Sequence, residues 1–239
     1  LLNTFNISKD TFRFFAKQLM TEYRNVPYHN FLHAFDVTQM TFYFLTRGGL
    51  SKYLTDLDIL ALLISAMSHD VCHPGLNNNF QELTRSPLAV KYNDQSILEN
   101  HHISSMFQIM NQSCCNLMDP LSKEDANEVR KIIISNILAT DMKHHFEILT
   151  LFTAKIKKSA TFDRLNCNDR LFLMKIALKC ADVCNAVRPF RVSEKWAKAV
   201  RIPGKKRKAI GEIIKGETFQ DPWYPAHEAN GEADRFVKS

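Results

Sequence analysis

Histidines and an aspartate in the first third of the chain stand at spacings that suit a metal site. His29 and His33 are four residues apart, and His69 is followed directly by Asp70 and four residues later by His73. Residues four apart share one face of a helix, so their side chains can point the same way. Imidazole suits transition metals, and a carboxylate can bridge two cations. If the two stretches meet in space, they offer three or four imidazoles and a carboxylate to one point, which is a metal site in outline.

Each of these groups alone also has an ordinary structural explanation. Two histidines four residues apart are more often surface or core residues than ligands. A further candidate ligand is the carboxylate of Asp182, which could instead form an ion pair with Lys179 or Arg188. The positions are more informative than the residue types. His69-Asp70 and Asp182 each end a strongly apolar helical run, where ionisable groups need a partner. Taken together, the order of these groups along the chain predicts a metal site.

A site of this kind makes metal-activated hydrolysis the leading chemistry. Two nearby cations can share a hydroxide and neutralise phosphoryl oxygens, and the leaving oxygen then needs a proton. A histidine beside the metals but not bound to them can supply that proton near neutral pH. We expect His29 in this role, because His33 takes the ligand role on the same segment. Glu99 and Asp141 are candidates either for contacts around the metals or for a helix cap and a surface charge.

The elements that position these residues are predicted to be helices. Apolar residues recur at three- and four-residue steps, as in Phe12, Phe15 and Leu19, a pattern typical of an amphipathic helix. No stretch alternates in two-residue steps between turn signals, so we expect no β-sheet and an all-α fold with eight or more helices before residue 200. In the first half of the chain we expect helices at 12–23 and 31–45, one from Ile59 capped by Thr55 and Asp58, and, after a turn at 73–79, a short one within 83–92. In the second half we expect helices at 97–110, capped by Ser96, from Ser122 to about Thr140, and at 144–156, followed by one that Asn168 opens and one that Ser193 opens.

Composition and charge narrow the class of protein. The chain has 239 residues, of which 45% are hydrophobic and 10% aromatic, enough for a large packed core. The formal charge is +6, but acidic and basic residues are interspersed, and the one dense basic run, 205–208, is interpreted as a solvated loop. We therefore expect no nucleic-acid partner, whereas a mildly positive surface favours an anionic small molecule.

Cysteine usage and hydropathy bear on location and on domain organisation. There are six cysteines but no C-x-x-C pair and no signal peptide, which indicates free thiols and a reducing, cytoplasmic setting. No apolar run is long enough to span a bilayer, so no membrane is expected within this segment. Apolar periodicity weakens after residue 200, where glycines and prolines accumulate. We expect residues 1–200 to form the main part of one helical domain and 201–239 to form a divergent, loop-rich tail of it.

Several of these segments together resemble a known family. Their order and spacing are similar to those of class I 3′,5′-cyclic-nucleotide phosphodiesterases over about residues 10 to 200. The matching motifs are Tyr28-His29-Asn30 with His33 and Asp36-Val37, His69-Asp70 with His73-Pro74-Gly75, Tyr92-Asn93-Asp94, Leu98-Glu99-Asn100-His101-His102, Leu138-Ala139-Thr140-Asp141-Met142, and Cys180-Ala181-Asp182 with Asn185. Six motifs in the family's order make the resemblance specific.

The resemblance implies an all-helical, HD-type catalytic domain that hydrolyses the 3′ phosphoester bond of cyclic AMP or cyclic GMP to the 5′-monophosphate. His29 is implied as the general acid for the O3′ leaving group. The implied zinc ligands are His33, His69, Asp70 and Asp182, and a second cation, magnesium or manganese, shares Asp70 and is otherwise held by water. The groups implied around the metal-bound waters are His73, Asn78, Glu99, His102 and Asp141, and those near the nucleotide are Tyr28 and Asn185.

The end of the chain departs from the family pattern. After Trp196 the family continues with a helix rich in glutamate and phenylalanine, whereas this chain has a basic run that begins near Arg201. The glutamine with which the family binds the purine falls beyond Ser239, so the resemblance does not decide between cyclic AMP and cyclic GMP. The alternatives are a truncated, weakly active or inactive metal-binding form, and another HD-type phosphohydrolase. Besides the cyclic nucleotide, the expected partner is a second copy of the full-length protein in a homodimer.

Overall fold

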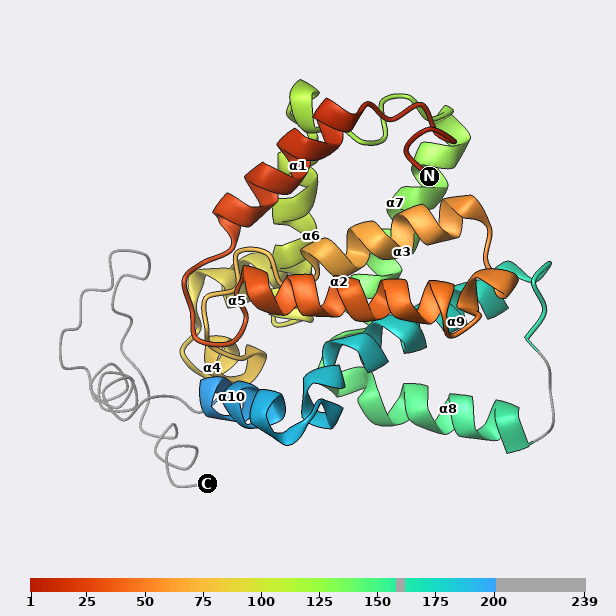
Figure 1. Cartoon of the computed structure of the whole chain (residues 1–239). Coiled ribbons are helices and arrows are strands. Elements are labelled where there is room, and N and C mark those ends of the chain that lie inside the picture. The colour runs from red at the N-terminus through yellow and green to blue at the C-terminus, as the bar shows by residue number, and fades with distance from the viewer. Residues whose placement is uncertain (158–161, 201–239) are drawn as a thin grey trace.

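The computed structural model describes residues 1–157 and 162–200, and every regular element within them is helical (Figure 1). The all-α prediction is therefore confirmed for these residues. The α-helices are α1 (Lys9–Glu22), α2 (Phe31–Thr46), α3 (Asp56–Ser68), α4 (Asn78–Leu83), α5 (Pro87–Tyr92), α6 (Ile97–Met110), α7 (Lys123–Leu138), α8 (His145–Lys157), α9 (Cys167–Asp182) and α10 (Phe190–Val200). Short 3₁₀ helices lie at η1 (Leu50–Tyr53), η2 (Ser113–Cys115), η3 (Met142–His144) and η4 (Cys184–Val187). The predicted tail at 201–239, with its basic run, lies outside the described residues.

Helix α2 carries part of the first motif, and local chemistry sets both of its ends. Asn30 is its cap, because the side-chain oxygen of Asn30 accepts hydrogen bonds from the backbone N–H groups of Leu32 and His33. The helix ends at Thr46, shortly before the pair Gly48-Gly49, and Gly49 adopts a left-handed conformation with φ of 75°, which glycine tolerates without steric cost. His33 is thereby fixed in the first helical turn, while His29 lies just before the helix.

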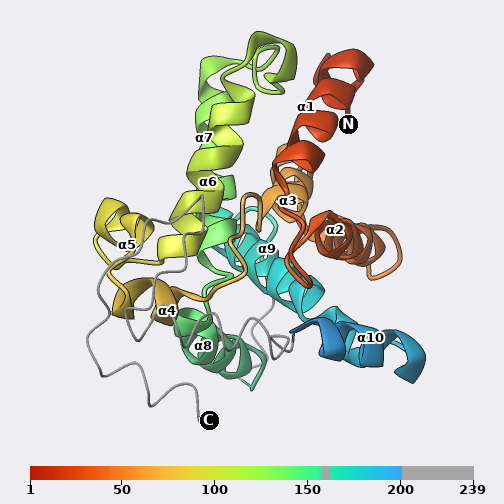
Figure 2. The ribbon, with the colours of Figure 1, turned by 90° about the vertical axis from the view of Figure 1, so that its left-hand side faces the viewer.

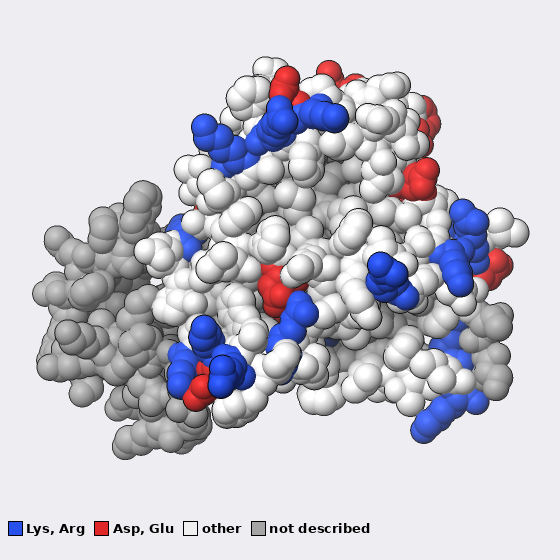
Figure 3. All heavy atoms as spheres, viewed as in Figure 1, with Lys and Arg blue, Asp and Glu red and all other residues white. Residues whose placement is uncertain are grey.

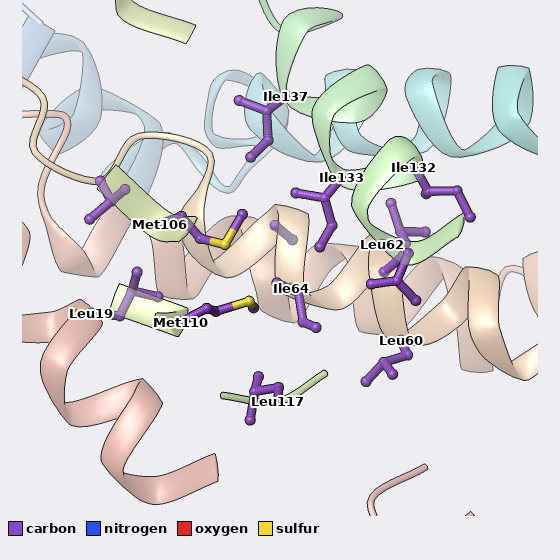
Figure 4. Packing of buried hydrophobic residues seen from close by; sticks show 14 of the residues in the cluster. Leu19, Leu60, Leu62, Ile64, Met106, Met110, Leu117, Ile132, Ile133 and Ile137 are labelled. Carbon is purple, nitrogen blue, oxygen red and sulfur yellow. The ribbon is translucent and has the colours of Figure 1, made fainter. Parts of the chain in front are cut away.

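Helix α3 lies at the centre of the fold. Its start is fixed by the predicted capping box, in which the Thr55 hydroxyl accepts from the Asp58 N–H (3.2 Å) and the Asp58 carboxylate accepts from the Thr55 N–H (2.8 Å). Leu60, Leu62 and Ile64 are buried, and α3 packs against α2, α7 and α9. Figure 4 shows side chains from α3, α6 and α7 meeting in this core. Contact with helices on several sides explains why the segment is apolar nearly all round.

Two helix starts in asparagine-rich stretches differ from the prediction. The turn expected to continue to residue 79 stops at Asn77, whose side-chain oxygen accepts a hydrogen bond from the Phe80 N–H (2.9 Å) and caps α4. The helix predicted to open at Asn168 begins at Cys167, because the preceding Asn166 is its cap. Where several asparagines stand close together, the sequence alone does not show which of them turns its side chain onto the helix.

Of three predicted serine caps, one is confirmed and two are wrong. Ser122 caps α7 as predicted. Ser96 precedes α6, but its backbone is left-handed (φ 39°) and its side chain does not cap that helix; its hydroxyl donates to the Asp141 carboxylate instead (2.8 Å). Ser193 lies inside α10, where its hydroxyl donates to the Phe190 carbonyl (3.1 Å). Both errors arise because a hydroxyl can bond several neighbours and the surrounding fold decides which.

Three helices bring their ends to one place (Figures 1 and 2). Helices α2, α3 and α9 pack against one another. Helix α3 is followed directly by His69, α9 ends at Asp182, and α2 begins beside His33. At the opposite ends of α3 and α9, Arg170 donates to Asp58 (2.8 Å) in a mostly buried ion pair. The ligand-bearing ends therefore belong to elements that are already fixed relative to one another.

The surface of the described part is mixed in charge. On the face seen in Figure 3, lysine and arginine side chains are scattered among uncharged atoms, and acidic groups lie between some of them. This distribution agrees with the interspersed charges of the sequence. None of the helices in the described ranges combines the length and the apolar character that a membrane span needs.

Candidate metal centre

The four residues predicted to bind the first metal come together at the junction of α2, α3 and α9. His33 Nε2 lies 3.0 Å from Asp182 Oδ1 and 3.3 Å from Asp70 Oδ2. His69 Nε2 lies 3.2 Å from Asp70 Oδ2 and 3.4 Å from Asp182 Oδ1. The two imidazole nitrogens are 3.3 Å apart. One donor atom from each of the four residues lies within 4.8 Å of the others.

This set of donor atoms fits a divalent cation. Nδ1 of His69 faces the backbone carbonyl of Ala66 at 3.0 Å and must donate to it, which leaves the lone pair of Nε2 for a cation when the ring is neutral. Imidazole nitrogens and carboxylate oxygens are both ligands of zinc, which is usually four-coordinate. Lone pairs on four mutually close atoms repel one another, so the arrangement needs positive charge among them.

Without a cation, the electrostatics of the four groups favour protonated imidazoles beside ionised carboxylates, so a binding cation takes the place of the imidazole protons. Burial lowers the pKa of His33 and of His69, but the nearby carboxylates outweigh it and leave both pKa values raised. Burial would raise the pKa of Asp70 and of Asp182, but the imidazoles hold both pKa values below their ordinary range. Both carboxylates therefore stay ionised, which metal binding requires.

Asp70 also faces a second group of imidazoles. Its Oδ1 lies 3.7 Å from His102 Nε2, and donor atoms of Asp70, His73 and His102 lie within 4.8 Å of one another. His102 Nδ1 donates to the Val71 carbonyl (2.7 Å), so its Nε2 is free to accept. His73 Nδ1 instead accepts from the Gly75 N–H (2.9 Å), which places the proton of the neutral ring on Nε2. His73 is thus arranged to donate a hydrogen bond rather than to bind a cation.

His29 lies beside the four ligands without joining them. Its ring stacks on that of His73, with centroids 3.8 Å apart and an interplanar angle of 14°, and the His33 ring lies 5.9 Å away. Burial lowers the pKa of His29, and the Asp70 carboxylate partly offsets that effect. The general-acid role expected for His29 requires a position of this kind, close to the four groups but outside them.

Glu99, Asn78 and Asp141 bring further polar groups to this region. Asn78 donates to Glu99 (2.8 Å) and accepts from the Leu98 N–H (2.9 Å), which ties the start of α4 to the start of α6. Burial raises the pKa of Glu99 to about 7; the bond from Asn78 opposes this shift, while Asp141 and Asp70 add to it. Asp141 is itself buried. Of the groups predicted around the metal, His73, Glu99, His102 and Asp141 are thus buried, and Asn78 is bonded to Glu99.

The order and spacing of these residues match a family of known proteins. A family model for 3′,5′-cyclic nucleotide phosphodiesterases matches residues 28–202, which include every residue of the centre described above. The chain belongs to this phosphodiesterase family. The resemblance inferred from six short motifs is thereby confirmed over most of the chain.

The curated phosphodiesterases that the chain matches are much longer than the chain. The 3′,5′-cyclic-nucleotide phosphodiesterase regA of Dictyostelium discoideum is 44% identical over 174 residues, which cover 73% of this chain and 22% of regA. The high affinity cGMP-specific 3′,5′-cyclic phosphodiesterase 9A of Mus musculus is 41% identical over 196 residues, which cover 82% of this chain and 36% of that protein. The chain thus spans between a fifth and two fifths of the length of these two relatives.

Phosphodiesterase domains of known structure share the fold. The phosphodiesterase domain of the Salpingoeca rosetta rhodopsin phosphodiesterase is 30% identical with a TM-score of 0.83, over 99% of this chain and 70% of that one. LmjPDEB1 in complex with IBMX is 33% identical with a TM-score of 0.81, over 90% of this chain and 64% of that one. The compact helical fold is therefore that of phosphodiesterase catalytic domains.

Tyr28 and Asn185, which the phosphodiesterase resemblance places near the nucleotide, contact each other. The Asn185 amide donates to the Tyr28 hydroxyl, and burial raises the pKa of Tyr28 to about 12. The Trp196 ring lies 5.5 Å from the Tyr28 ring and 5.9 Å from the His33 ring. From the sequence Trp196 is only a helix residue, because its place beside the first motif depends on how α10 folds back onto α2.

Tyr23 is another residue whose contact with the centre the sequence does not reveal. Its hydroxyl donates to the Met67 carbonyl (3.0 Å) and accepts from the Asp70 N–H (3.3 Å). These two bonds fix the backbone where α3 ends and the ligands begin. In the sequence Tyr23 is only the last residue of an apolar helix face, and the signal that distinguishes it is the hydroxyl on an otherwise apolar stripe.

The ion pairs considered as alternatives for Asp182 are absent among the described residues. Arg188 pairs with Asp36 (2.6 Å), and the Lys179 ammonium donates to the backbone carbonyl of Ala139 (3.2 Å). The Asp182 carboxylate faces the two imidazoles instead. The choice between ligand and ion pair depends on which way the end of α9 turns, and the sequence leaves that open.

Proposed function

We propose that the chain forms the metal-binding part of a 3′,5′-cyclic-nucleotide phosphodiesterase that hydrolyses cyclic AMP or cyclic GMP to the 5′-monophosphate. The observation that carries this proposal is the convergence of His33, His69, Asp70 and Asp182 at the ends of three packed helices. Membership of the phosphodiesterase family and the activities named for its relatives support it.

The two cations are assigned from the chemistry of the donor atoms. Zinc suits the four convergent ligands, because it favours a four-coordinate set that includes imidazole nitrogens. Magnesium or manganese suits the second position, since Asp70 Oδ1 offers a hard oxygen there and water supplies most of the remaining ligands. When bound, the two cations activate water as Lewis acids and neutralise charge on the phosphate.

The protein's own side chains move protons and hold the substrate. As water adds to phosphorus the bond to O3′ breaks, and His29 donates the proton that the departing O3′ requires. Tyr28 and Asn185, joined by a hydrogen bond, line the space beside the ligands where the nucleotide lies. The groups that orient nearby water by hydrogen bonds are His73, Asn78, Glu99, His102 and Asp141.

Hydrolysis of both cyclic nucleotides by the purified chain, with and without EDTA, tests the proposal. We expect turnover of at least one nucleotide, its loss in EDTA, and its recovery when zinc and magnesium are restored. Turnover that survives complete metal removal contradicts the proposal. Full metal content without hydrolysis of either nucleotide favours an inactive metal-binding form, and hydrolysis of other phosphate esters alone favours another HD-type phosphohydrolase.

Location and subunit organisation are part of the same proposal. All six cysteines are free, which suits the reducing cytoplasm that we propose. A homodimer of the full-length protein is proposed from the family resemblance. Cell fractionation tests the first of these and light scattering of the full-length protein tests the second.

A further inference from the structure

Lys179 is a lysine in the protein interior, one helical turn before Asp182 on α9. Only 7% of its surface is exposed, and lysines are seldom buried without a partner. No step of the proposed reaction uses this residue. Its contacts therefore indicate what it does.

The Lys179 ammonium lies against the C-terminal end of α7. It donates to the carbonyl oxygens of Ala139 (3.2 Å) and Asp141 (3.5 Å). Carbonyls that follow a helix lack partners within it and carry partial negative charge, so a cation is favoured there. Burial lowers the pKa of Lys179, and the carboxylates of Asp182, Asp141 and Glu99 partly offset that effect. The direct partners of this buried cation are therefore the two backbone carbonyls.

Asp141 is held from three sides. Its Oδ2 accepts from the Ser96 hydroxyl (2.8 Å), its Oδ1 accepts from the Lys143 N–H (2.9 Å), and its backbone carbonyl accepts from Lys179. Ser96 makes its contact from a left-handed backbone with φ of 39° and ψ of 57°, a conformation that costs energy for residues other than glycine. The fold therefore retains local strain at a serine whose hydroxyl is directed at this carboxylate.

We propose that Lys179 is a positioning residue, which fixes the 139–141 turn against α9 and so holds the Asp141 carboxylate near Glu99. The lysine connects the helical turn that ends at Asp182 with the turn that carries Asp141. Losing this contact frees the 139–141 turn to move relative to the ligand-bearing end of α9. The contacts stand by themselves, and only their effect on turnover rests on the proposed function.

Amide hydrogen exchange of the complete 239-residue chain tests the positioning directly. Lys179→Met keeps an unbranched side chain but removes the charge and the donor. We expect the amide of Lys143, which is bonded to Asp141, to exchange about fivefold to tenfold faster, since a local hydrogen-bonded contact is lost. The amide of Ile133, in the middle of α7, should keep its rate. An unchanged rate at Lys143 overturns the proposal.

Two further variants keep the test decisive. Lys175→Met is the matched control, because it makes the same change one turn earlier on α9, and it should leave the Lys143 amide at the wild-type rate. An equal acceleration in both variants overturns the proposal. If Lys179→Met does not fold, Lys179→Gln replaces it, since the glutamine amide nitrogen ends about one bond short of the position of the lysine ammonium and so falls short of hydrogen-bond distance to the carbonyls. Faster exchange at Lys143 then supports the proposal, and an unchanged rate overturns it.

Turnover separates positioning from simple structural support. In Lys179→Met we expect kcat to fall about tenfold and KM to stay within about threefold of wild type, as for other residues that support a metal site indirectly. Adding this change to Asp141→Asn should cause no further loss, because the lysine acts through Asp141. A multiplicative loss, or a rise in KM alone, overturns the proposal. If the wild type hydrolyses neither nucleotide, the proposed function fails and the exchange rates alone decide this inference.

Discussion

The histidines of the centre differ in role because their Nδ1 atoms have different hydrogen-bond partners. His69 and His102 donate Nδ1 to backbone carbonyls at 3.0 and 2.7 Å, so the Nε2 lone pair of each is free on the side of Asp70. His73 accepts the Gly75 N–H at Nδ1 (2.9 Å), so its Nε2 donates. One residue type therefore offers either a ligand atom or a proton, according to the backbone around it.

His29 and Asp182 should separate proton transfer from metal binding. Asp182→Ala removes one of the four proposed ligands, so we expect bound zinc and turnover to be lost together. His29→Ala leaves all four ligands in place, so zinc content should stay at the wild-type level while kcat falls by about 10²–10⁴, the usual contribution of a general acid. Elemental analysis measures the zinc, and nucleotide hydrolysis measures kcat.

The matched control for these variants is His144→Ala. The His144 side chain is 42% exposed and faces Glu147 (3.8 Å) at the start of α8. Its removal should change neither zinc content nor kcat. Loss of zinc from His29→Ala would show that His29 is itself a ligand, contrary to the role proposed for it.

Glu99 should make the metal-free protein lose stability as the pH rises. Burial, with a contribution from Asp141, raises the pKa of Glu99 from 4.5 to about 7. When folding raises the pKa of a group, the group stabilises the fold at pH values below its pKa in the unfolded chain. This stabilisation is lost as the pH rises through its pKa in the folded protein. The glutamine in Glu99→Gln cannot ionise, so this variant should not lose stability in this way. In EDTA, the free energy of unfolding of the variant minus that of wild type should therefore increase by about 2 kcal/mol between pH 5 and pH 8.

Urea unfolding at the two pH values measures this difference. Glu128→Gln makes the same change at a side chain that is 45% exposed, and it controls for the loss of a surface charge. A difference between Glu99→Gln and wild type that stays constant over this range would contradict the prediction that folding raises the pKa of Glu99.

At the scale of elements, the centre is built from helix ends that are held in pairs. Helices α3 and α9 meet near the ligands at their C-terminal ends, where Tyr23 also holds the Asp70 backbone. At their N-terminal ends Arg170 donates to Asp58 at 2.8 Å. The two helices are therefore joined at both ends, by an ion pair at one and by the ligand cluster at the other.

Arg170→Met should loosen the end of this pair that is remote from the ligands. It leaves the Asp58 carboxylate, whose side chain is 3% exposed, without its cation. Breaking a buried ion pair costs about 3–5 kcal/mol, and the bonds that Thr55 retains to Asp58 should reduce the loss to about 2–3 kcal/mol in urea unfolding. Lys198→Met removes an exposed pair with Glu194 and should cost less than about 0.5 kcal/mol. Equal losses would show that the Asp58–Arg170 pair does not tie α3 to α9.

Contacts within one helical turn can be predicted from the sequence, whereas contacts between separate elements cannot. Thr55 and Asp58 form the predicted cap because both partners lie within four residues. Ser96 resembles a cap equally well, yet its hydroxyl donates to Asp141, 45 residues away, and Arg170 meets Asp58 across 112 residues. Such contacts depend on which elements become neighbours. The convergence of the four proposed ligands could be predicted, because ionisable residues that end apolar runs stand out before the fold is known.

At the scale of the whole molecule, the centre joins distant parts of the chain. His33 and Asp182 are 149 residues apart in the sequence and 3.0 Å apart in space. The helices next to the four predicted ligands, α2, α3 and α9, also pack against one another in the fold. A cation that binds only the folded chain therefore stabilises the helical domain as a unit.

Removing the metal should accordingly lower the melting temperature of the whole domain. At free zinc of about 100 times the dissociation constant, binding stabilises the fold by about 2.7 kcal/mol, which corresponds to about 5–10 °C for a protein of this size. Calorimetry of zinc-loaded and EDTA-treated protein measures the shift, and Asp182→Ala should show no difference between the two conditions. If wild type melts at the same temperature after its zinc is stripped, the ion is not held at the junction of α2, α3 and α9, because an ion bound there must dissociate when these helices separate.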